Sequence, residues 1–456
     1  MDNYTIQTLI TQGRLVASGD VDPNNTYVQI GVWQSGNRKS GASNDAYPSY
    51  VIPLSEIAPP PVAPIIDVLG TSLYSTNPAA GPNFSTANGI FFGDKAGGSA
   101  SNASTSIFIG GRAGEFATNA YASNFIGSQA GRLATDATNS NFIGTFAGQS
   151  ATDAYDSNFI GREAGISATN ANNSNFIGNK AGRLAEDAFL SNFIGWNAGR
   201  EAISAFASNF IGSNSGFSAT NANTSNFIGQ NAGLFATNAS TSNFIGNNVG
   251  QGATNANNSN FIGNSAGFTA TTSSYSNFIG DFAGYSASGA TESNFIGKNA
   301  GNLATNSLYS NFIGTIAGTG AANSQSSNFI GPNAGQNASG SSSSNFIGNA
   351  AGLGSANASN SIFIGRQAGR NAPGVTYSVF IGENAGLNST ASNVVAIGKS
   401  AAIGNTVPDC FVISNAHIPV YPNAAAAAVG LAGGVAGNTY LYWDSGLSVL
   451  NAVRIP

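Results

Sequence analysis

A glycine recurs every 17 residues along most of this chain of 456 residues. It closes the motif S-N-F-I-G, and it occupies positions 93, 110, 127 and onwards to 382 in 18 copies without one insertion. A diverged copy, in which V-A-I-G replaces N-F-I-G, ends 16 residues later at Gly398. Repetition at a short fixed period is the signature of a repeat fold in which every repeat packs on its neighbours.

The consensus of the repeat is S-N-F-I-G-x-x-A-G-x-x-A-T-x-A-x-x. It has no apolar stripe of helical period, and 17 residues are too few for a helix-turn-helix unit. Two short strands and two turns would use up such a repeat, so we predict an all-β fold, a parallel β-solenoid or β-roll. Equivalent residues would stack about 4.8 Å apart, and 18 coils would make a rod on the order of 85 Å long. The glycines are expected at corners, where they allow a positive φ or a close approach of two coils.

The strand S-N-F-I-G carries large apolar residues on both of its faces. Because side chains alternate along a strand, Phe points to one face while Asn and Ile point to the other. One coil has one interior, so the second apolar face needs another chain, and we predict self-association. We place Ile and Asn inside the roll and Phe between chains, where the small Ala residues would allow close approach. The residues assigned to structural ladders are Asn124, Phe125, Ile126, Gly127, Asn141, Phe142, Ile143, Gly144, Phe108 and Phe380.

The position before Phe separates the middle of the repeat array from its ends. It is Asn in 14 consecutive copies, from Asn124 to Asn345. An amide can donate and accept along a stack, whereas the amide of a terminal coil would lack a partner on one side. We therefore predict a hydrogen-bonded Asn ladder with distinct ends. The ladder ends are Ile90, Ile107, Ile362 and Val379.

The composition argues against most classes of enzyme and binding protein. Only 8% of residues are charged, and the chain has one Cys, one His and one Met. Metal sites, cofactor sites and His-dependent catalysis are therefore not expected, and we predict that the protein is not an enzyme. A net charge of -5 gives no support for nucleic-acid binding. The start of the chain has no signal-like segment and no stretch suits a bilayer, so we expect folding in the cytosol and no membrane insertion.

Two columns of equivalent residues admit more specific functions. Asp136 and Asp153 are equivalent residues of adjacent coils, with Asp187 two coils further on. Such a pair could serve a retaining glycosidase or bind a cation, but no aromatic residues for sugar stacking were recognised beside it, and solvated acids are the commoner case. A column of Thr, which includes Thr118 and Thr220, suggests an ice-binding surface. Such a surface should have two parallel columns of Thr, and here the second column is Ala. His417 is expected to be a packed or exposed residue of the C-terminal cap, and Cys410 a buried thiol.

The sequence divides into four regions on this basis. Residues 1–57 are a non-repeating N-terminal docking or cap domain, and residues 58–88 are a Pro-rich connector that should be extended and stiff. Residues 89–404 are the β-roll shaft. Residues 405–456 are a C-terminal cap or tip, with β-prone stretches around a run of small residues. Solenoids need such caps because an open coil end exposes unpaired backbone groups.

The repeats resemble the head repeats of trimeric autotransporter adhesins, above all N-V-V-A-I-G-K-S-A at residues 393–401. Similar repeats occur in bacteriophage tail fibres, and the ending A-A-A-A-V-G-L…L-Y…G-L-S-V-L, within residues 424–455, is similar to the closing segment of many phage tail proteins. The resemblance implies a parallel β-roll in each chain of a homotrimer. Because neither the adhesin family's extended signal peptide nor its membrane anchor is recognised, we expect a phage-type fibre.

The expected function is therefore that of a stiff trimeric shaft for attachment to a host surface. Its partners would be two further copies, other tail or baseplate proteins at a terminal domain, and a glycan or protein receptor on the host. It would fold in the host cytoplasm and reside in the virion. The alternative is an extracellular adhesin or filament subunit of a cell surface that binds glycans. A polysaccharide depolymerase spike comes third.

Overall fold

The computed structural model describes residues 89–413 in full and the backbone of seven strands outside this range. These strands are β1 (Tyr27–Ile30), β2 (Tyr50–Pro53), β3 (Ile66–Leu69), β4 (Ser72–Ser75), β25 (Val420–Tyr421), β26 (Thr439–Asp444) and β27 (Val449–Arg454). β1 pairs with β2 antiparallel, and β25, β26 and β27 form a three-stranded sheet. Contacts divide the chain into two compact units, one of residues 1–68 and 74–76 and one of residues 69–73 and 77–456. The predicted docking domain, connector and most of the C-terminal cap lie outside the fully described range.

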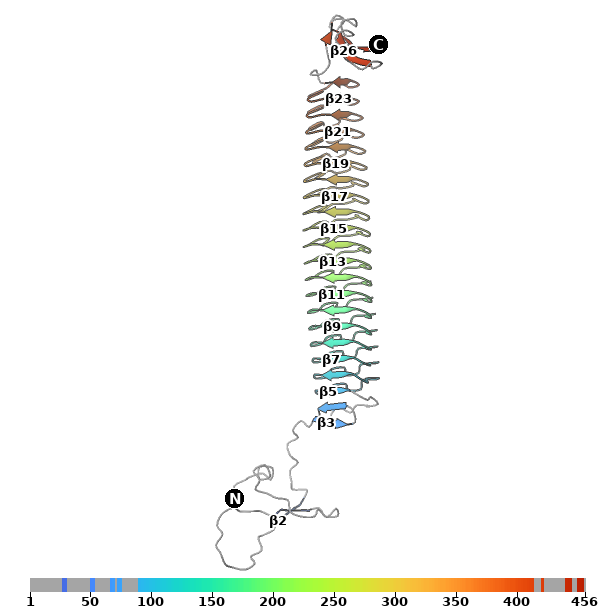
Figure 1. Cartoon of the computed structure of the whole chain (residues 1–456), viewed down its shortest axis with the longest axis vertical. Helices are drawn as coiled ribbons and strands as arrows, with labels where there is room; N and C mark the ends of the chain where they lie inside the picture. Colours follow the sequence, from blue (N-terminus) through green and yellow to red (C-terminus); the bar gives the residue numbers. More distant parts are fainter. Residues whose placement is uncertain are drawn as a thin grey trace, which may run out of the picture. The chain divides into compact units, whose positions relative to one another are not determined.

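Residues 89–413 form a β-solenoid of about 19 coils (Figure 1). Each coil contributes one strand of three residues, and each strand pairs in parallel with the next, one repeat along the chain, as Phe125 does with Phe142. No helix occurs in this range. The predicted all-β solenoid of 17-residue coils is confirmed. The strands are β5 (Ile90–Phe92), β6 (Ile107–Ile109), β7 (Asn124–Ile126), β8 (Asn141–Ile143), β9 (Asn158–Ile160), β10 (Asn175–Ile177), β11 (Asn192–Ile194), β12 (Asn209–Ile211), β13 (Asn226–Ile228), β14 (Asn243–Ile245), β15 (Asn260–Ile262), β16 (Asn277–Ile279), β17 (Asn294–Ile296), β18 (Asn311–Ile313), β19 (Asn328–Ile330), β20 (Asn345–Ile347), β21 (Ile362–Ile364), β22 (Val379–Ile381), β23 (Val395–Ile397) and β24 (Phe411–Ile413).

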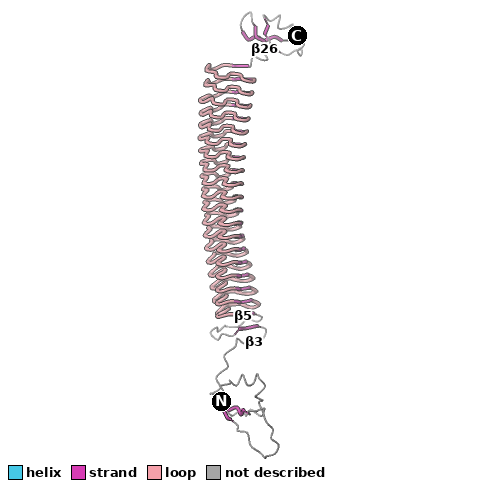
Figure 2. Tube along the Cα trace, turned by 90° about the vertical axis from the view of Figure 1, so that its left-hand side faces the viewer, coloured by secondary structure: helices cyan, strands magenta, loops and turns pink. Residues whose placement is uncertain are grey.

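A coil has one strand rather than the two that the sequence suggested. The strands occupy one side of the stack, and turns make up the remainder of each coil (Figure 2). On the Thr column only isolated parallel bridges form, from Ile203 to Ala322. The reason lies in the frequent left-handed residues, which interrupt an extended backbone: in one coil Leu133, Asp136 and Asn139 have φ of 61°, 50° and 54°. The turns therefore take the place of the second strand.

The interior is a stack of phenylalanine rings. Phe108, Phe125, Phe142 and Phe380 are all fully buried within their own chain. The rings of Phe125 and Phe142 lie parallel with centroids 4.7 Å apart. The assignment of Phe to the outside and of Ile and Asn to the inside was therefore wrong. The Ala residues three and seven places after the glycine are buried too, so they line the interior and do not serve close approach between chains.

The packing of the coil explains why Phe is the inward residue. The second glycine of each repeat faces the ring: a Cβ on Gly131 would lie 2.3 Å from the ring of Phe125. The rest of the lining is mainly Ala and Ser, with a few Val such as Val249, so each coil leaves space for one large side chain. A ring that stacks at the coil spacing fills this space, whereas the β-branched Ile would not.

The Ser of the motif also lies inside the coil. Ser157 is buried, and its hydroxyl donates a hydrogen bond to the carbonyl of Ala171 at 2.6 Å. The same hydroxyl accepts a bond from the backbone N–H of Ser174 at 3.0 Å. A buried polar group with both partners carries little penalty. The interior Ser column therefore links successive coils.

The glycine that closes the motif sits where two coils come closest. Gly127 has a φ of 133°, and a Cβ on it would lie 2.6 Å from the carbonyl oxygen of Gly144. The expected corner role of Gly127 and Gly144 is thus confirmed, both in the positive φ and in the close approach.

Near its C-terminal end the ladder continues beyond the predicted boundary at residue 404. β24 pairs in parallel with β23, with Phe411 opposite Val395. The coil between β22 and β23 is one residue shorter than the others. It buries Ser389 and Ala391, which are two residues apart, whereas the equivalent buried residues of other coils are three apart. The coil accommodates the deletion by losing one turn position and keeps its strand in register.

Candidate functional site

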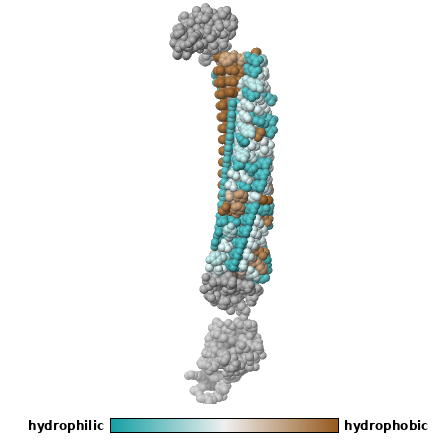
Figure 3. All heavy atoms as spheres, turned by 90° about the vertical axis from the view of Figure 1, so that its right-hand side faces the viewer, coloured by the Kyte–Doolittle hydropathy of each residue, from teal (hydrophilic) through white to brown (hydrophobic). Residues whose placement is uncertain are grey.

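The outward face of strands β5–β24 presents two parallel columns, which we call the Asn–Ile face: the residue before the ladder Phe and the residue after it. In β8 these are Asn141, half-buried, and Ile143, which is 36% exposed. Ile245 and Ile397 are 38% and 40% exposed. Figure 3 shows the isoleucines as a hydrophobic column beside a hydrophilic one. Neither column contains a charged residue between positions 90 and 397. The Asn–Ile face is therefore a long, neutral, partly apolar strip.

The Asn column forms the predicted hydrogen-bonded ladder. The Nδ2 of Asn124 donates to the Oδ1 of Asn141 at 2.7 Å, and the Nδ2 of Asn141 donates to Asn158 at 2.7 Å. The same bond repeats up to Asn345. Each internal amide thus both donates and accepts, which fixes the orientation of the whole column.

The ladder ends are aliphatic, as the sequence indicated. Ile107 lies opposite Asn124 in the strand pairing, and Ile362 lies opposite Asn345. Ile90 and Val379 continue these two blocks outwards. Their side chains are half-buried and carry no amide group. The chemistry of the face therefore changes at both ends of the described shaft.

The acidic column has a conformational explanation. Asp136, Asp153 and Asp187 have φ of 50°, 50° and 51°, and Asn170 between them has 49°. Asn and Asp adopt this left-handed conformation more readily than other residues with a side chain. The Nδ2 of Asn170 donates to the Oδ1 of Asp187 at 2.7 Å. Asp136 and Asp187 are thus turn residues that each accept a hydrogen bond from the amide one coil earlier.

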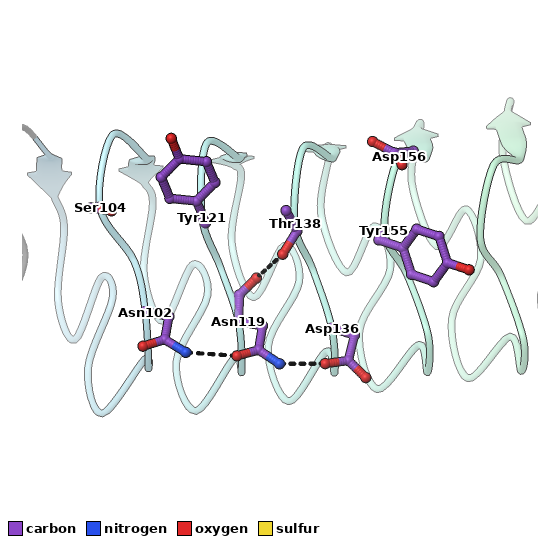
Figure 4. Close-up of a pocket in the computed structure, with 8 residues that line it drawn as sticks. All are labelled: Asn102, Ser104, Asn119, Tyr121, Asp136, Thr138, Tyr155 and Asp156. Carbon is purple, nitrogen blue, oxygen red and sulfur yellow. Dashed lines mark hydrogen bonds between the residues drawn. The ribbon is translucent and has the colours of Figure 1, made fainter.

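The structure nevertheless brings aromatic residues to this column, which the sequence reading missed. A groove with a volume of about 710 Å³ is lined by the row Asn102, Asn119 and Asp136 and by Tyr121 and Tyr155. Figure 4 shows the two tyrosine rings two coils apart, along one side of the polar row. The signal was present in the sequence, because Tyr121 and Tyr155 are equivalent positions two repeats apart and lie two residues beyond the Asn/Asp column.

The Thr column does not form a two-rank Thr surface. Thr220, Thr237 and Thr254 bridge successive coils through their backbones. The Ala residues one place before and two places after each of these Thr residues are buried in the interior and do not form a second outer rank. The column therefore fits better as β-prone residues on a regular edge than as a flat ice-binding plane.

Charged side chains pair between coils. The guanidinium of Arg132 lies 2.9 Å from the carboxylate of Glu115, the equivalent residue one coil earlier, and Glu115 is buried. Glu383 lies between its equivalents Arg366 and Lys399 and pairs with both. Because stacked copies of one charge repel each other, opposite signs in adjacent coils, as here, are the more favourable arrangement for stacked charges.

Two residues near the C-terminal end of the shaft, Cys410 and His417, have side chains that could serve a site. Cys410 is half-buried rather than buried, and its thiol contacts the carbonyl of Val407 at 3.2 Å. His417 lies outside the described residues. Within the described part of the chain, no group of three His, Cys, Asp or Glu residues could hold a metal ion. The described residues also include no helix that is long and apolar enough to cross a bilayer.

No protein-family model matches the chain, and a search among curated proteins finds no related sequence.

Proposed function

We propose that the protein is a structural and adhesive fibre, a stiff shaft that assembles as a homotrimer through the Asn–Ile face. The observation that carries the proposal is the isoleucine column, which stays partly exposed from coil to coil, as at Ile143, Ile245 and Ile397. With a spacing of about 4.8 Å per coil the strip is on the order of 90 Å long. Continuous apolar surface of this kind on a soluble chain usually marks a protein–protein contact.

A second copy of the same chain is the partner that this strip fits best. The strip repeats at the coil spacing over its whole length, and another copy has the same repeat. Closed symmetry is the usual outcome of such self-association, and the resemblance to trimeric adhesin heads and phage fibres favours three chains. The absence of charge in both columns removes like-charge repulsion from the contact.

A fibre role agrees with the organisation of the shaft. Backbone hydrogen bonds join every coil to the next, as from Asn124 to Ser140 at 2.9 Å, and the Phe stack runs along the same axis. Such a rod transmits force along its axis, and its number of coils sets the distance between the parts at its two ends. Attachment of a virion to a host surface is the use that the resemblance favours, with the cell-surface adhesin as the alternative.

The test of assembly is the mass of the full chain in solution. We expect three times the chain mass of 45.8 kDa. The double variant Ile228→Glu, Ile245→Glu places charge in the strip and should dissociate the trimer. Leu303→Glu changes an apolar residue that is 58% exposed but lies outside the Asn–Ile face, and it should leave the mass unchanged. A stable monomer of the unmodified chain would overturn the proposed assembly.

The biological role is tested by locating the protein in a particle or cell preparation and by identifying the genes that lie beside its own gene. We expect antibodies against the shaft to label tails in a particle preparation, and the neighbouring genes to encode other tail components. Neighbouring secretion genes and labelling of a cell surface would support the adhesin instead.

A further inference from the structure

The groove beside Asp136 is a second surface with its own chemistry. One edge of the groove is a row of polar side chains. The Nδ2 of Asn102 donates to the Oδ1 of Asn119 at 2.7 Å, and the Nδ2 of Asn119 donates to Asp136 (Figure 4). Thr138 is fixed at the same place, because its hydroxyl donates to the backbone carbonyl of Asn119 at 2.8 Å. The polar groups are therefore held in a regular row before any ligand arrives.

The aromatic edge of the groove is also regular. Tyr121 and Tyr155 are 49% and 40% exposed, and the short Thr138 occupies the equivalent position in the coil between them. The coil spacing, given by the stacked core rings at 4.7 and 4.8 Å, places the backbones of the two tyrosines about 9.5 Å apart along the rod. Each tyrosine therefore has side-chain surface open to a ligand, with a gap between the two.

We propose that this groove binds an extended, neutral glycan chain laid along the rod axis. Sugar rings present C–H faces that pack on aromatic rings, and their hydroxyls pair with amide and carboxylate groups, which are the two kinds of group that line the groove. A separation of two coils is of the order of the length of two sugars in an extended β-1,4-linked chain. Alternate sugars would pack on Tyr121 and Tyr155, with the sugar between them over Thr138.

Charge restricts the class of glycan. Asp136 and Asp156 are the charged residues that line the groove, and no basic residue lines it. A sialylated, phosphorylated or uronic-acid chain would meet uncompensated negative charge, so a neutral chain is favoured. The inference gives the proposed adhesive fibre a ligand class, and in that respect it rests on the proposed function.

The experiment measures binding of defined hexasaccharides to the full chain by calorimetry and by saturation-transfer NMR. The probes are cellohexaose and chitohexaose as extended neutral chains, maltohexaose as a coiled neutral chain, and a hyaluronan hexasaccharide as an acidic one. We expect binding of at least one extended neutral probe and none of the other two. The variant Tyr121→Ala, Tyr155→Ala should lower the affinity at least tenfold, because it removes both packing surfaces.

Two controls separate loss of the site from loss of structure. Tyr121→Phe, Tyr155→Phe keeps both rings and should retain binding. Tyr275→Ala changes a tyrosine that is 61% exposed and does not line the groove, and it should bind like the unmodified chain. Absence of binding to both extended probes, equal binding by the double Ala variant, or a preference for maltohexaose or hyaluronan would overturn the inference.

The mass of the same samples keeps this test separate from that of the fibre. A trimer that binds no probe overturns the groove alone. A monomer that binds the extended probe and loses it in the double Ala variant overturns the assembly alone.

Discussion

The side chain of Asn226 links its two neighbours in the Asn column: it accepts a hydrogen bond from Asn209 and donates one to Asn243, both at 2.7 Å. The two bonds run in the same direction along the rod. Removal of one amide therefore affects the amide before it and the amide after it.

Asn226→Leu is expected to destabilise the shaft by about 1–2 kcal/mol, because a donor of Asn209 and an acceptor of Asn243 lose their partners. The free energy of unfolding in urea measures the effect, and amide hydrogen exchange should localise it to the neighbouring coils. Asn345→Ile is the matched control, since it breaks one bond only and extends the aliphatic block at Ile362. Equal losses for the two variants would contradict the ladder as a source of stability.

The glycine at the close approach of two coils gives a sharper contrast. Gly127→Ala should cost more than about 2 kcal/mol, because its φ is unfavourable for Ala and its Cβ would meet the carbonyl of Gly144. Gly111→Ala is the control: nothing lies within 4 Å of a Cβ there, and its φ is not positive. This variant should be within about 0.5 kcal/mol of the unmodified chain or slightly more stable. Thermal unfolding of both variants measures the difference, and similar melting temperatures would be inconsistent with the packing described.

The period, the solenoid, the glycine corners and the Asn ladder could all be predicted from the sequence. Each follows from one fact, that equivalent residues of identical repeats must stack. Which of Phe and Ile faces inwards could not be predicted, because strand alternation is satisfied by either choice. The decision comes from Gly131, Ala and Ser, which shape the interior, and these residues come together only in the closed coil.

The single strand per coil and the groove depended on details that the consensus hides. Non-glycine residues such as Leu133 and Asn139 take a left-handed conformation, which residue type alone does not indicate for Leu. The groove depends on Tyr121 and Tyr155, which are exceptions to the consensus and so disappear when the repeats are averaged. Departures from the repeat therefore carried the information about a specific site.

The buried ring stack should dominate the stability of each coil. Phe261→Ala leaves a cavity between rings that lie 4.7 and 5.0 Å away and should destabilise by about 3–5 kcal/mol. Phe235→Ala is the matched control, because Phe235 is 53% exposed and outside the stack, and we expect less than about 1 kcal/mol. Urea unfolding monitored by circular dichroism compares them. If Phe235→Ala proved the more destabilising, the inward assignment of the motif Phe would fail.

Sign alternation of stacked charges can be tested at Glu383, which pairs with Arg366 and Lys399 on either side. Glu383→Lys places three cations in one column at the coil spacing. Because these side chains are largely exposed, the loss should be modest, about 0.5–1 kcal/mol, and should shrink as salt is added. Glu292→Lys is the control, since its equivalents one coil away on either side are Tyr275 and Tyr309, and it creates no stacked charge. Unfolding at low and at high salt measures both variants. A loss for Glu383→Lys that does not depend on salt would point to packing, and would remove the electrostatic reason for the low charge of the repeats.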